Sequence, residues 1–282
     1  MGTLEQKRQQ LEIILQEAGR VVVAFSGGVD SAVVACAAQR VCGDQAVAVT
    51  AVSPSLASGE LENAIAIAGR IGIAHRVIGT QEFASPGYLQ NASNRCYFCK
   101  TELYTRIEEL LPELEYDTLV NGANADDVGD HRPGMRAATE HHVRSPLLEA
   151  GLTKDEVRAI ALQWELPIWD KPASPCLSSR IAYGVPVTPE RVARVDAAEA
   201  WLRSELGIRE LRVRHEAHEL ARVELPFDQL PRIFAEQRAG KIAAQLRSLG
   251  FQYVTIDLEG FRSGSLNAVL TGEELVPLRL PK

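Results

Sequence analysis

Short apolar runs alternate with longer stretches of helical periodicity along the first half of the chain. The runs are rich in β-branched residues, and apolar residues recur every three to four positions in the stretches between them. This pattern is typical of buried parallel strands connected by helices. The predicted strands cover residues 21–25, 46–52, 74–78 and 118–121, and the predicted helices cover 32–41, 60–71 and 100–111. The alternation predicts an α/β fold with a doubly wound parallel sheet, in which ligands bind beyond the carboxyl ends of the strands.

A different pattern fills the second half of the chain. Thr153 and Glu156 form a capping box that starts another helix, and the proline-rich stretch 166–189 after it is too irregular for a helix or a strand. Beyond this long loop, the pattern predicts helices over 191–206 and 229–249 and strands over 210–215, 220–225 and 253–258. We therefore expect two domains, an α/β domain over residues 1–185 and a smaller α+β domain over residues 186–282.

Composition and charge narrow the function. The chain has 282 residues, of which 46% are hydrophobic and 24% charged, as in ordinary soluble proteins. The first 20 residues carry charges throughout, and no apolar run reaches membrane-spanning length, so we expect a cytoplasmic protein with no membrane partner. The net charge is −7, and residues 186–282 carry as many basic as acidic side chains. Nucleic-acid binding draws on an excess of Lys and Arg, so we expect a small-molecule substrate and no nucleic acid.

The most specific motif is Ser26-Gly27-Gly28-Val29-Asp30-Ser31, which follows the first predicted strand directly. The glycines allow a tight turn, and the free N–H groups and dipole of the next helix favour an anion. A Walker A loop is excluded because no Gly-Lys-Ser/Thr follows at its spacing. Asp30 would repel phosphate unless Mg²⁺ lies between them. The motif resembles the PP-loop of ATP pyrophosphatases, which cleave ATP between its α and β phosphates, so we expect Ser26, Gly27, Gly28, Asp30 and Ser31 to bind ATP.

A second polar segment, Asn121-Gly122-Ala123-Asn124-Ala125-Asp126-Asp127, follows the last predicted strand of the first domain, and Arg132 lies shortly beyond it. Asn and Gly favour turns, so an ordinary polar loop is one interpretation. Carboxylates near a triphosphate would instead contact Mg²⁺, and an arginine there would neutralise departing pyrophosphate. We expect Gly122 and Asp127 to bind ATP and Asp30 and Asp127 to hold Mg²⁺. Asp30 and Arg132 are predicted to act in catalysis, while Asp126 fits either interpretation.

Three of the five cysteines stand in unusual contexts. Cys96 and Cys99 form a Cys-x-x-Cys pair, and Cys176 lies in the proline-rich loop. The pair alone admits zinc, redox or cluster roles, and the chain has no second pair that would complete a zinc site. Three thiolates suit a [4Fe–4S] cluster with one iron left open, a variation on ligation by four cysteines. Spacing leaves open whether the three thiols meet at all.

Arg212-Val213-Arg214 alternates within a predicted strand, so both guanidinium groups lie on one face of it. Two convergent arginines bind phosphate well, and Glu199 on the preceding helix would orient them. A solvated face of the sheet is the alternative interpretation.

Taken in order, these residues resemble the LarE family of ATP-dependent sulfur transferases, which act in nickel-pincer nucleotide biosynthesis. The segments that carry the resemblance are Ser26–Ser31, Asn124–Asp127, Arg132–Gly134, Arg144–Leu147, Lys171–Arg180, Tyr183-Gly184 and Tyr253–Gly264. The resemblance implies a pyridinium-3,5-dicarboxylate mononucleotide as substrate, whose carboxylate is adenylated with release of pyrophosphate and then converted to a thiocarboxylate. It places Arg180, Glu199, Arg212 and Arg214 at the substrate phosphate and Cys176 at the sulfur attachment point.

The added Cys96 and Cys99 imply the branch of the family in which a [4Fe–4S] cluster delivers sulfide. Members with the equivalent of Cys176 alone sacrifice its sulfur and are left with dehydroalanine. A persulfide relay among the three thiols stays open as an alternative. The resemblance also implies a homo-oligomer and a possible sulfur-donor protein. A PP-loop tRNA thiolase, an amidotransferase-type ATP pyrophosphatase and a nucleotide-sensing module are the competing classes; the charge balance disfavours the first, and the three cysteines disfavour the second.

Overall fold

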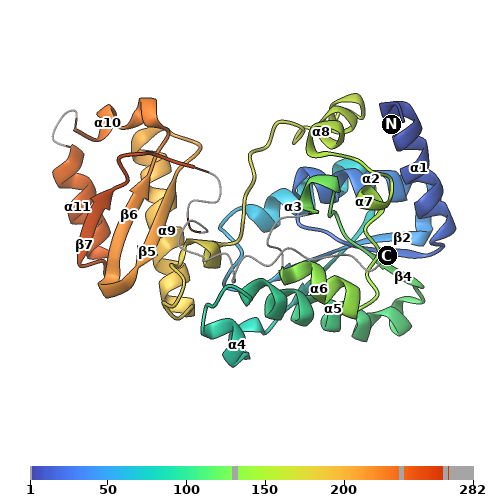
Figure 1. Ribbon diagram of the computed structural model, residues 1–282, viewed down its shortest axis with the longest axis horizontal. Coiled ribbons are helices and arrows are strands. Elements are labelled where there is room, and N and C mark those ends of the chain that lie inside the picture. The colour runs from blue at the N-terminus through green and yellow to red at the C-terminus, as the bar shows by residue number, and fades with distance from the viewer. Residues whose placement is uncertain (1, 129–132, 235–237, 263–265, 267–282) are drawn as a thin grey trace.

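The first half of the chain forms a parallel four-stranded sheet in the computed structural model, which describes residues 2–128, 133–234, 238–262 and 266 (Figure 1). The strand order is β3-β2-β1-β4, with β1 at Val21–Ala24, β2 at Ala46–Val52, β3 at Ala74–Gly79 and β4 at Thr118–Val120. Every neighbouring pair is parallel. The order reverses between β1 and β4, which is the switch point where open α/β sheets bind ligands. The predicted fold class is confirmed.

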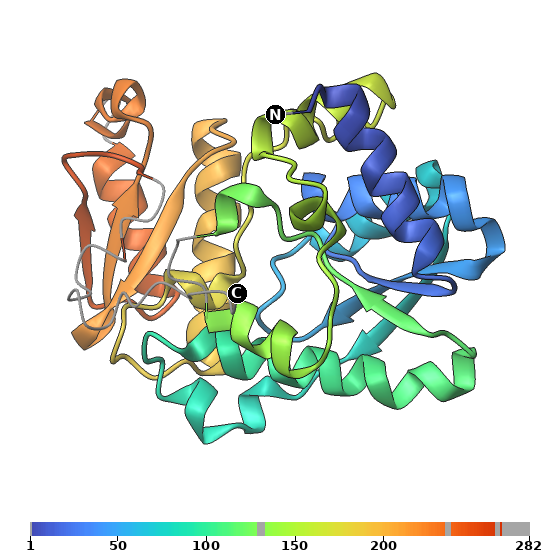
Figure 2. The same cartoon turned by 45° about the vertical axis from the view of Figure 1, so that its right-hand side comes forward.

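Helices cover both faces of this sheet, because successive strand residues point to opposite sides and both sides are apolar (Figures 1 and 2). Val21 and Val23 pack into one core with α1, α2, α3, α7 and α8, whereas Val22 packs into another with α5 and α6. The bounds are α1 Leu4–Glu17, α2 Val29–Cys42, α3 Glu60–Ile71, α4 Pro86–Leu89, α5 Arg95–Leu114, α6 Pro133–Glu140, α7 Pro146–Glu149 and α8 Lys154–Gln163.

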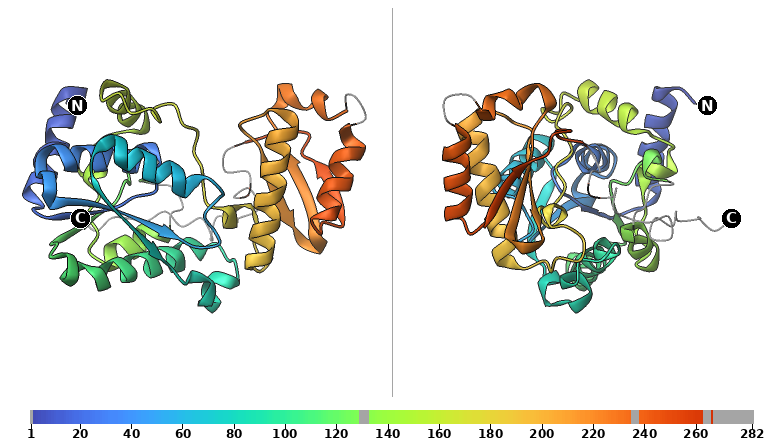
Figure 3. Two further views of the ribbon diagram at one scale, coloured as in Figure 1. Left: turned by 180° about the vertical axis from the view of Figure 1, so that it is seen from behind. Right: turned by 60° about the vertical axis from the view of Figure 1, so that its left-hand side comes forward.

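A second, three-stranded sheet follows in the order β5-β6-β7, with β5 (Arg212–Glu216) antiparallel to β6 (Leu220–Glu224) and β6 parallel to β7 (Tyr253–Ile256). Helices α9 (Pro189–Leu206) and α11 (Arg238–Ser248) pack on one face of it (Figure 3), and α10 (Pro231–Phe234) lies between β6 and α11 in the chain. Short 3₁₀ helices occur at Gly43–Gln45, Glu82–Ala84, Ala125–Asp127, Leu177–Arg180, Ala217–Glu219 and Phe227–Gln229.

The core of the second sheet also takes in residues from upstream of position 186. Leu177, Ile181 and Val185 belong to it, as does Tyr88 from α4. Ile181 forms an isolated parallel bridge with His215 on β5. The division into residues 1–185 and 186–282 therefore stays a prediction, and apolar packing crosses it.

One predicted helix starts later in the structure than expected and spans residues 235–237, which lie outside the described residues. The single helix predicted over 229–249 is described as α10 and α11, on either side of residues 235–237, and Gln229 belongs to a 3₁₀ turn. Proline favours the first position of a helix, since it lacks an N–H that the helix would have to satisfy there, so α10 starts at Pro231. Across the described residues, none of the helices has the length and apolar character needed to span a bilayer.

Candidate active site

The loop between β1 and α2 is held in shape by its own serines. The backbone N–H of Ser26 donates to Ser31 Oγ over 3.2 Å, and Ser31 Oγ donates to the carbonyl of Gly28 over 3.1 Å. Gly27 has a φ of 69°, and a Cβ there would lie 2.9 Å from Ala64 Cα on α3. Gly28 is the N-cap of α2 and has no side chain to cap it, so the first-turn N–H groups remain available to an anion.

Gly122 brings the loop after β4 against this phosphate loop. A Cβ at position 122 would lie 2.8 Å from the backbone nitrogen of Ser31, closer than real Cβ contacts allow. Asn124 Nδ2 then donates to Asp30 Oδ1 over 3.1 Å. The structure therefore brings the two predicted ATP-binding segments together at the switch point of the sheet.

Asp30 and Asp127 form a carboxylate pair at this junction. Burial raises the pKa of Asp30, the hydrogen bond from Asn124 opposes this, and the negative charge of Asp127 raises the pKa further. Lys154 Nζ lies 3.4 Å from Asp127 Oδ1. The pattern of residues did not identify Lys154, although its place directly after the N-cap Thr153 fixes it near the loop. Oxygen donors that repel one another beside a phosphate loop are the donor set that Mg²⁺ prefers.

Asp126 has a structural contact. Its Oδ2 accepts a hydrogen bond of 2.7 Å from the backbone N–H of Lys154, the first residue of α8. This contact favours a role at the helix N-terminus, where a carboxylate is stabilised by the helix dipole. Arg132, the predicted catalytic arginine, lies outside the described residues.

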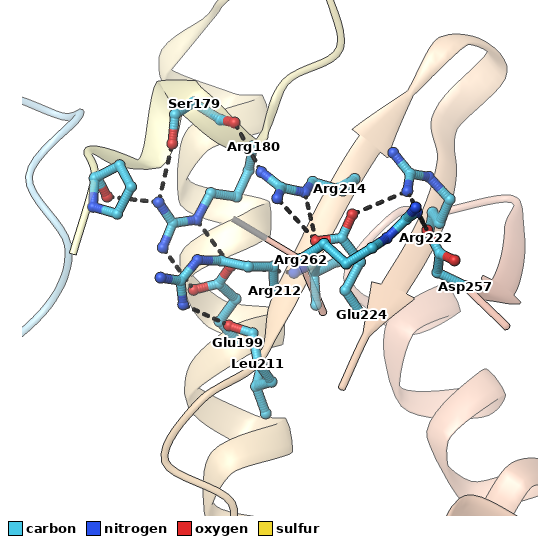
Figure 4. Close-up of polar contacts among 12 residues, drawn as sticks. Ser179, Arg180, Glu199, Leu211, Arg212, Arg214, Arg222, Glu224, Asp257 and Arg262 are labelled. Atoms are coloured by element: carbon cyan, nitrogen blue, oxygen red, sulfur yellow. Dashed lines mark hydrogen bonds and ion pairs between the residues drawn. The ribbon is translucent and has the colours of Figure 1, made fainter. Parts of the chain in front are cut away.

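The segment that carries Cys176 is fixed by a buried ion pair. Arg180 is 1% exposed, and its Nε donates to Glu199 Oε1 over 3.0 Å. Its Nη1 donates to the carbonyls of Pro175 and Cys176 over 2.5 and 3.1 Å. Figure 4 shows Arg180 reaching from this segment to Glu199 on α9. Binding of substrate phosphate by Arg180 stays a prediction, and these contacts favour a role in holding the Cys176 segment.

Glu199 also fixes the strand of the two predicted phosphate-binding arginines. It is fully buried and accepts from the backbone N–H of Val213 over 3.1 Å and from Arg203 over 2.6 Å. It therefore positions β5 through the backbone between Arg212 and Arg214. As predicted, Val213 is fully buried in the core.

Arg212 and Arg214 line a cavity of about 420 Å³, a volume in the range of small-molecule sites. Other lining residues include Arg95, Pro175, Ser179, Tyr183, Glu210, Phe261 and Arg262. Arg214 pairs with Glu224 (Nε–Oε2, 3.0 Å), a partner that the pattern of residues did not reveal. Arg212 donates to the carbonyl of Leu211, as Figure 4 shows, and to that of Ala173. Within the described chain it forms no ion pair with a carboxylate.

Positive charge exceeds negative charge among the described side chains that line the cavity. Burial, followed by the charge of Arg180, lowers the pKa of Arg212 to about 10, while Glu199 acts in the opposite direction. A dianionic phosphate would relieve this repulsion, so the electrostatics of the cavity suit a phosphorylated ligand.

The three cysteine thiols are near enough to influence one another's ionisation. Cys96 and Cys99 are in the first two turns of α5, and the chain just before this helix is tied to the Cys176 segment: Tyr88 and Ser178 share a hydrogen bond of 2.6 Å between their hydroxyls. Partial removal from water raises the pKa of Cys99, and the charge of a Cys176 thiolate raises it further. The same two causes raise the pKa of Cys96, which Arg95 opposes.

The chemistry of these three donors fits a sulfur-ligated group. Cys96 and Cys176 are exposed and Cys99 is half-buried, so their sulfur atoms are accessible to a ligand. Over the residues that the structure describes, no three His, Cys, Asp or Glu side chains are already arranged as a metal-binding group.

A phosphate loop without a Walker lysine, placed at the switch point of a parallel sheet beside a carboxylate pair, defines the PP-loop class of ATP-using enzymes. The comparison with protein families agrees, since residues 4–108 match the model of NAD synthase. A glutamine-hydrolyzing GMP synthase of Parafrankia is 30% identical over 67% of this chain and 40% of its own length.

Longer similarities identify the family. An uncharacterized protein of Synechocystis is 49% identical over 95% of this chain and 99% of its own length. The pyridinium-3,5-bisthiocarboxylic acid mononucleotide synthase of Lactiplantibacillus plantarum is 38% identical over 98% of this chain and 99% of its own. The chain therefore belongs to the family of this synthase, the LarE family predicted from the motifs, and is an ATP-dependent sulfurtransferase.

Proposed function

We propose that this enzyme converts a ring carboxylate of a pyridinium-3,5-dicarboxylate mononucleotide to a thiocarboxylate, as a step in the synthesis of a nickel-pincer nucleotide. The proposal is supported by the family relation and by a cavity whose arginines suit a phosphorylated ligand. A carboxylate resists attack by sulfur because hydroxide or oxide would have to leave, so the reaction needs activation first.

In the first half-reaction, the carboxylate oxygen of the substrate attacks the α-phosphorus of ATP. The bond from this phosphorus to the oxygen bridging to the β-phosphorus breaks, and pyrophosphate leaves with the electron pair. The loop over Ser26–Ser31 holds the phosphates, with Gly122 packed against it. Asp30 and Asp127 are the residues that would hold Mg²⁺, which neutralises charge on pyrophosphate. Arg132 is proposed to assist this departure.

In the second half-reaction, a sulfur nucleophile attacks the carbonyl carbon of the acyl adenylate. The carbon–oxygen bond to AMP breaks, and AMP leaves with the electron pair. When bound, a [4Fe–4S] cluster held by Cys96, Cys99 and Cys176 would supply sulfide from the iron that no cysteine ligates. The same reaction with sulfur from Cys176 itself, or from a cysteine persulfide, is the alternative.

One observation carries the proposal: the carboxylate of Glu199 connects the sulfur-bearing segment to the arginine strand. Through Arg180 it fixes the carbonyl of Cys176, and through the backbone of Val213 it fixes Arg212 and Arg214. Pro175 and Ser179, on either side of Cys176, line the arginine cavity. In this proposal, a nucleotide whose phosphate binds at β5 would have its ring end directed toward the Cys176 segment.

The two half-reactions separate in one experiment. With ATP and the dicarboxylate nucleotide, Cys176→Ala is expected to release pyrophosphate yet form no thiocarboxylate, whereas Asp30→Ala is expected to lose pyrophosphate release. Unchanged release by Asp30→Ala would contradict the metal role, and thiocarboxylate formation by Cys176→Ala would contradict the sulfur role.

The source of sulfur is tested on the wild-type protein, purified and reconstituted without oxygen. Iron and acid-labile sulfide bound in proportion to protein would support the cluster, and their absence would refute it. The intact mass after turnover distinguishes the alternatives, since sacrifice of Cys176 removes the mass of hydrogen sulfide from the chain.

A homo-oligomer, a sulfur-donor protein and a cytoplasmic location complete the proposal. Exposed apolar side chains on the second sheet and its helices, among them Phe227, Phe234 and Tyr253, support self-association. Light scattering of the purified protein tests this, because a monomer at micromolar concentration would contradict it.

A further inference from the structure

Arg95 is a buried arginine at the start of α5 that the reaction above leaves without a role. It is 6% exposed and lines the cavity that also contains Arg212 and Arg214. Its Nη1 donates to Asn91 Oδ1, and Asn91 is itself fully buried. Asn91 Nδ2 in turn donates to the carbonyls of Ala182 and Val185, each over 2.8 Å. The guanidinium group therefore stands on a fixed support between the thiols and the cavity.

Among the described residues, Arg95 has no carboxylate partner for its charge. Throughout the described chain, no Asp or Glu side chain forms an ion pair with it, in contrast to Arg180 and Arg214. The groups whose charges act on it are thiols and phenols, namely Cys176, Cys96, Tyr88 and Tyr183. Thiols and phenols do not offer a guanidinium group the two parallel bonds that a carboxylate offers, so a carboxylate ligand at this point would be stabilising.

The cavity contains groups for each part of a dicarboxylate nucleotide. Arg212 and Arg214 on β5 suit the phosphate, and Tyr183 and Phe261 supply rings for apolar contact. A pyridinium dicarboxylate carries two ring anions, of which adenylation consumes one. The other stays charged, and a guanidinium group binds a carboxylate through two parallel N–H bonds.

We infer that Arg95 binds a ring carboxylate of the substrate and thereby selects dicarboxylate nucleotides over otherwise similar pyridinium nucleotides. This inference rests on the proposed function, because it assigns a contact to that substrate. Asn91 is a positioning residue, since it touches Arg95 rather than the ligand.

Binding without ATP tests the inference separately from catalysis. Calorimetric titration would compare the pyridinium-3,5-dicarboxylate mononucleotide with nicotinamide mononucleotide, which keeps ring, ribose and phosphate but has no carboxylate. Loss of one charge-assisted pair weakens binding roughly 10- to 100-fold. We expect Arg95→Gln to weaken binding of the dicarboxylate nucleotide by this factor. Binding of nicotinamide mononucleotide should weaken by less than about 2-fold.

Two controls interpret this result. Arg212→Gln is expected to weaken both nucleotides alike, because both carry the phosphate. Arg262→Gln removes the same charge from the same cavity at a half-exposed position. If it reproduced the selective loss, the overall charge of the cavity would set the preference and the assignment to Arg95 would be wrong.

If Arg95→Gln fails to fold, Arg95→Lys is used instead, because it keeps the positive charge. This variant is expected to retain part of the preference for the dicarboxylate. A wild type that binds neither nucleotide would contradict the proposed function. If the wild type prefers the dicarboxylate and the Arg95→Gln variant shows the same preference, only the inference about Arg95 is contradicted.

Discussion

Asn91 ties the start of α5 to the Cys176 segment, so its replacement by alanine is a sensitive test of the site architecture. The side chain is fully buried, with Nδ2 directed at the carbonyls of Ile181, Ala182 and Val185 and Oδ1 at Arg95. Its φ is 55°, in the left-handed region, where asparagine is tolerated and alanine is strained.

The expected loss of stability follows from these contacts. Nδ2 has two hydrogens, so its three carbonyl contacts count as about two hydrogen bonds of roughly 1 kcal/mol each. The bond to the charged guanidinium contributes about 1.5–3 kcal/mol more. The left-handed backbone adds about 1 kcal/mol for alanine. We expect Asn91→Ala to lower the free energy of unfolding by about 4.5–6 kcal/mol, a large part of a typical total of about 5–15 kcal/mol.

Urea denaturation measures this loss. Circular dichroism and tryptophan fluorescence must report coincident transitions before one free energy is derived. Asn91→Gly is the matched control, because it removes the same hydrogen bonds but relieves the left-handed strain, and it should be about 1 kcal/mol more stable than Asn91→Ala. A loss below about 1 kcal/mol in both variants would refute the argument, as would a glycine variant less stable than the alanine one.

Three further predictions concern the same site. Asp30→Asn should stabilise the ligand-free protein at neutral pH. Burial and a neighbouring carboxylate raise the pKa of Asp30 in the folded state. Its ionisation therefore costs stability as the pH rises from the unfolded pKa of about 4 through the folded pKa. At a pH below both pKa values, thermal melts should show no gain in stability for the variant. Gly122→Ala should weaken ATP binding about 10-fold or more by overpacking, whereas Gly69→Ala on α3, with open space around it, should leave binding unchanged in an ATP titration. Glu224→Gln should raise the KM for the nucleotide substrate with little change in kcat, because an amide holds the Arg214 guanidinium less firmly in its position at the cavity; a fall in kcat alone would contradict this.

The first sheet could be predicted because its strands are nearly uniform apolar runs. The strand predicted over 46–52 is β2 as observed, and the helix predicted over 60–71 is α3, which Gly59 and Gly72 bound on either side. The capping box of Thr153 and Glu156 is present, with the Thr153 N–H donating to Glu156 Oε2 over 2.9 Å. Such local signals determine elements without help from the rest of the chain.

Contacts between distant segments carry no comparable signal. Asn91 and Arg95 stand in an unremarkable polar stretch, and only the packing of α4 and α5 on the second core makes them buried. Lys154 meets Asp127 because α8 starts beside the loop after β4. The motifs therefore predict candidate reacting groups, whereas the residues that hold those groups in place depend on tertiary structure.

The two arginines of β5 show what decides such contacts. Alternation predicted that Arg212 and Arg214 share a face, and both line the cavity. The two arginines differ in how their charges are paired, and this difference depends on the pairing of β5 with β6. In that pairing, Arg212 lies opposite Glu224 and Arg214 lies opposite Arg222. The Glu224 carboxylate nevertheless pairs with Arg214, its diagonal neighbour, and with Arg222. Since Arg214 and Arg222 already share that carboxylate, Arg212 is the β5 guanidinium whose charge is least balanced, and we expect it to contribute most to binding of the substrate phosphate.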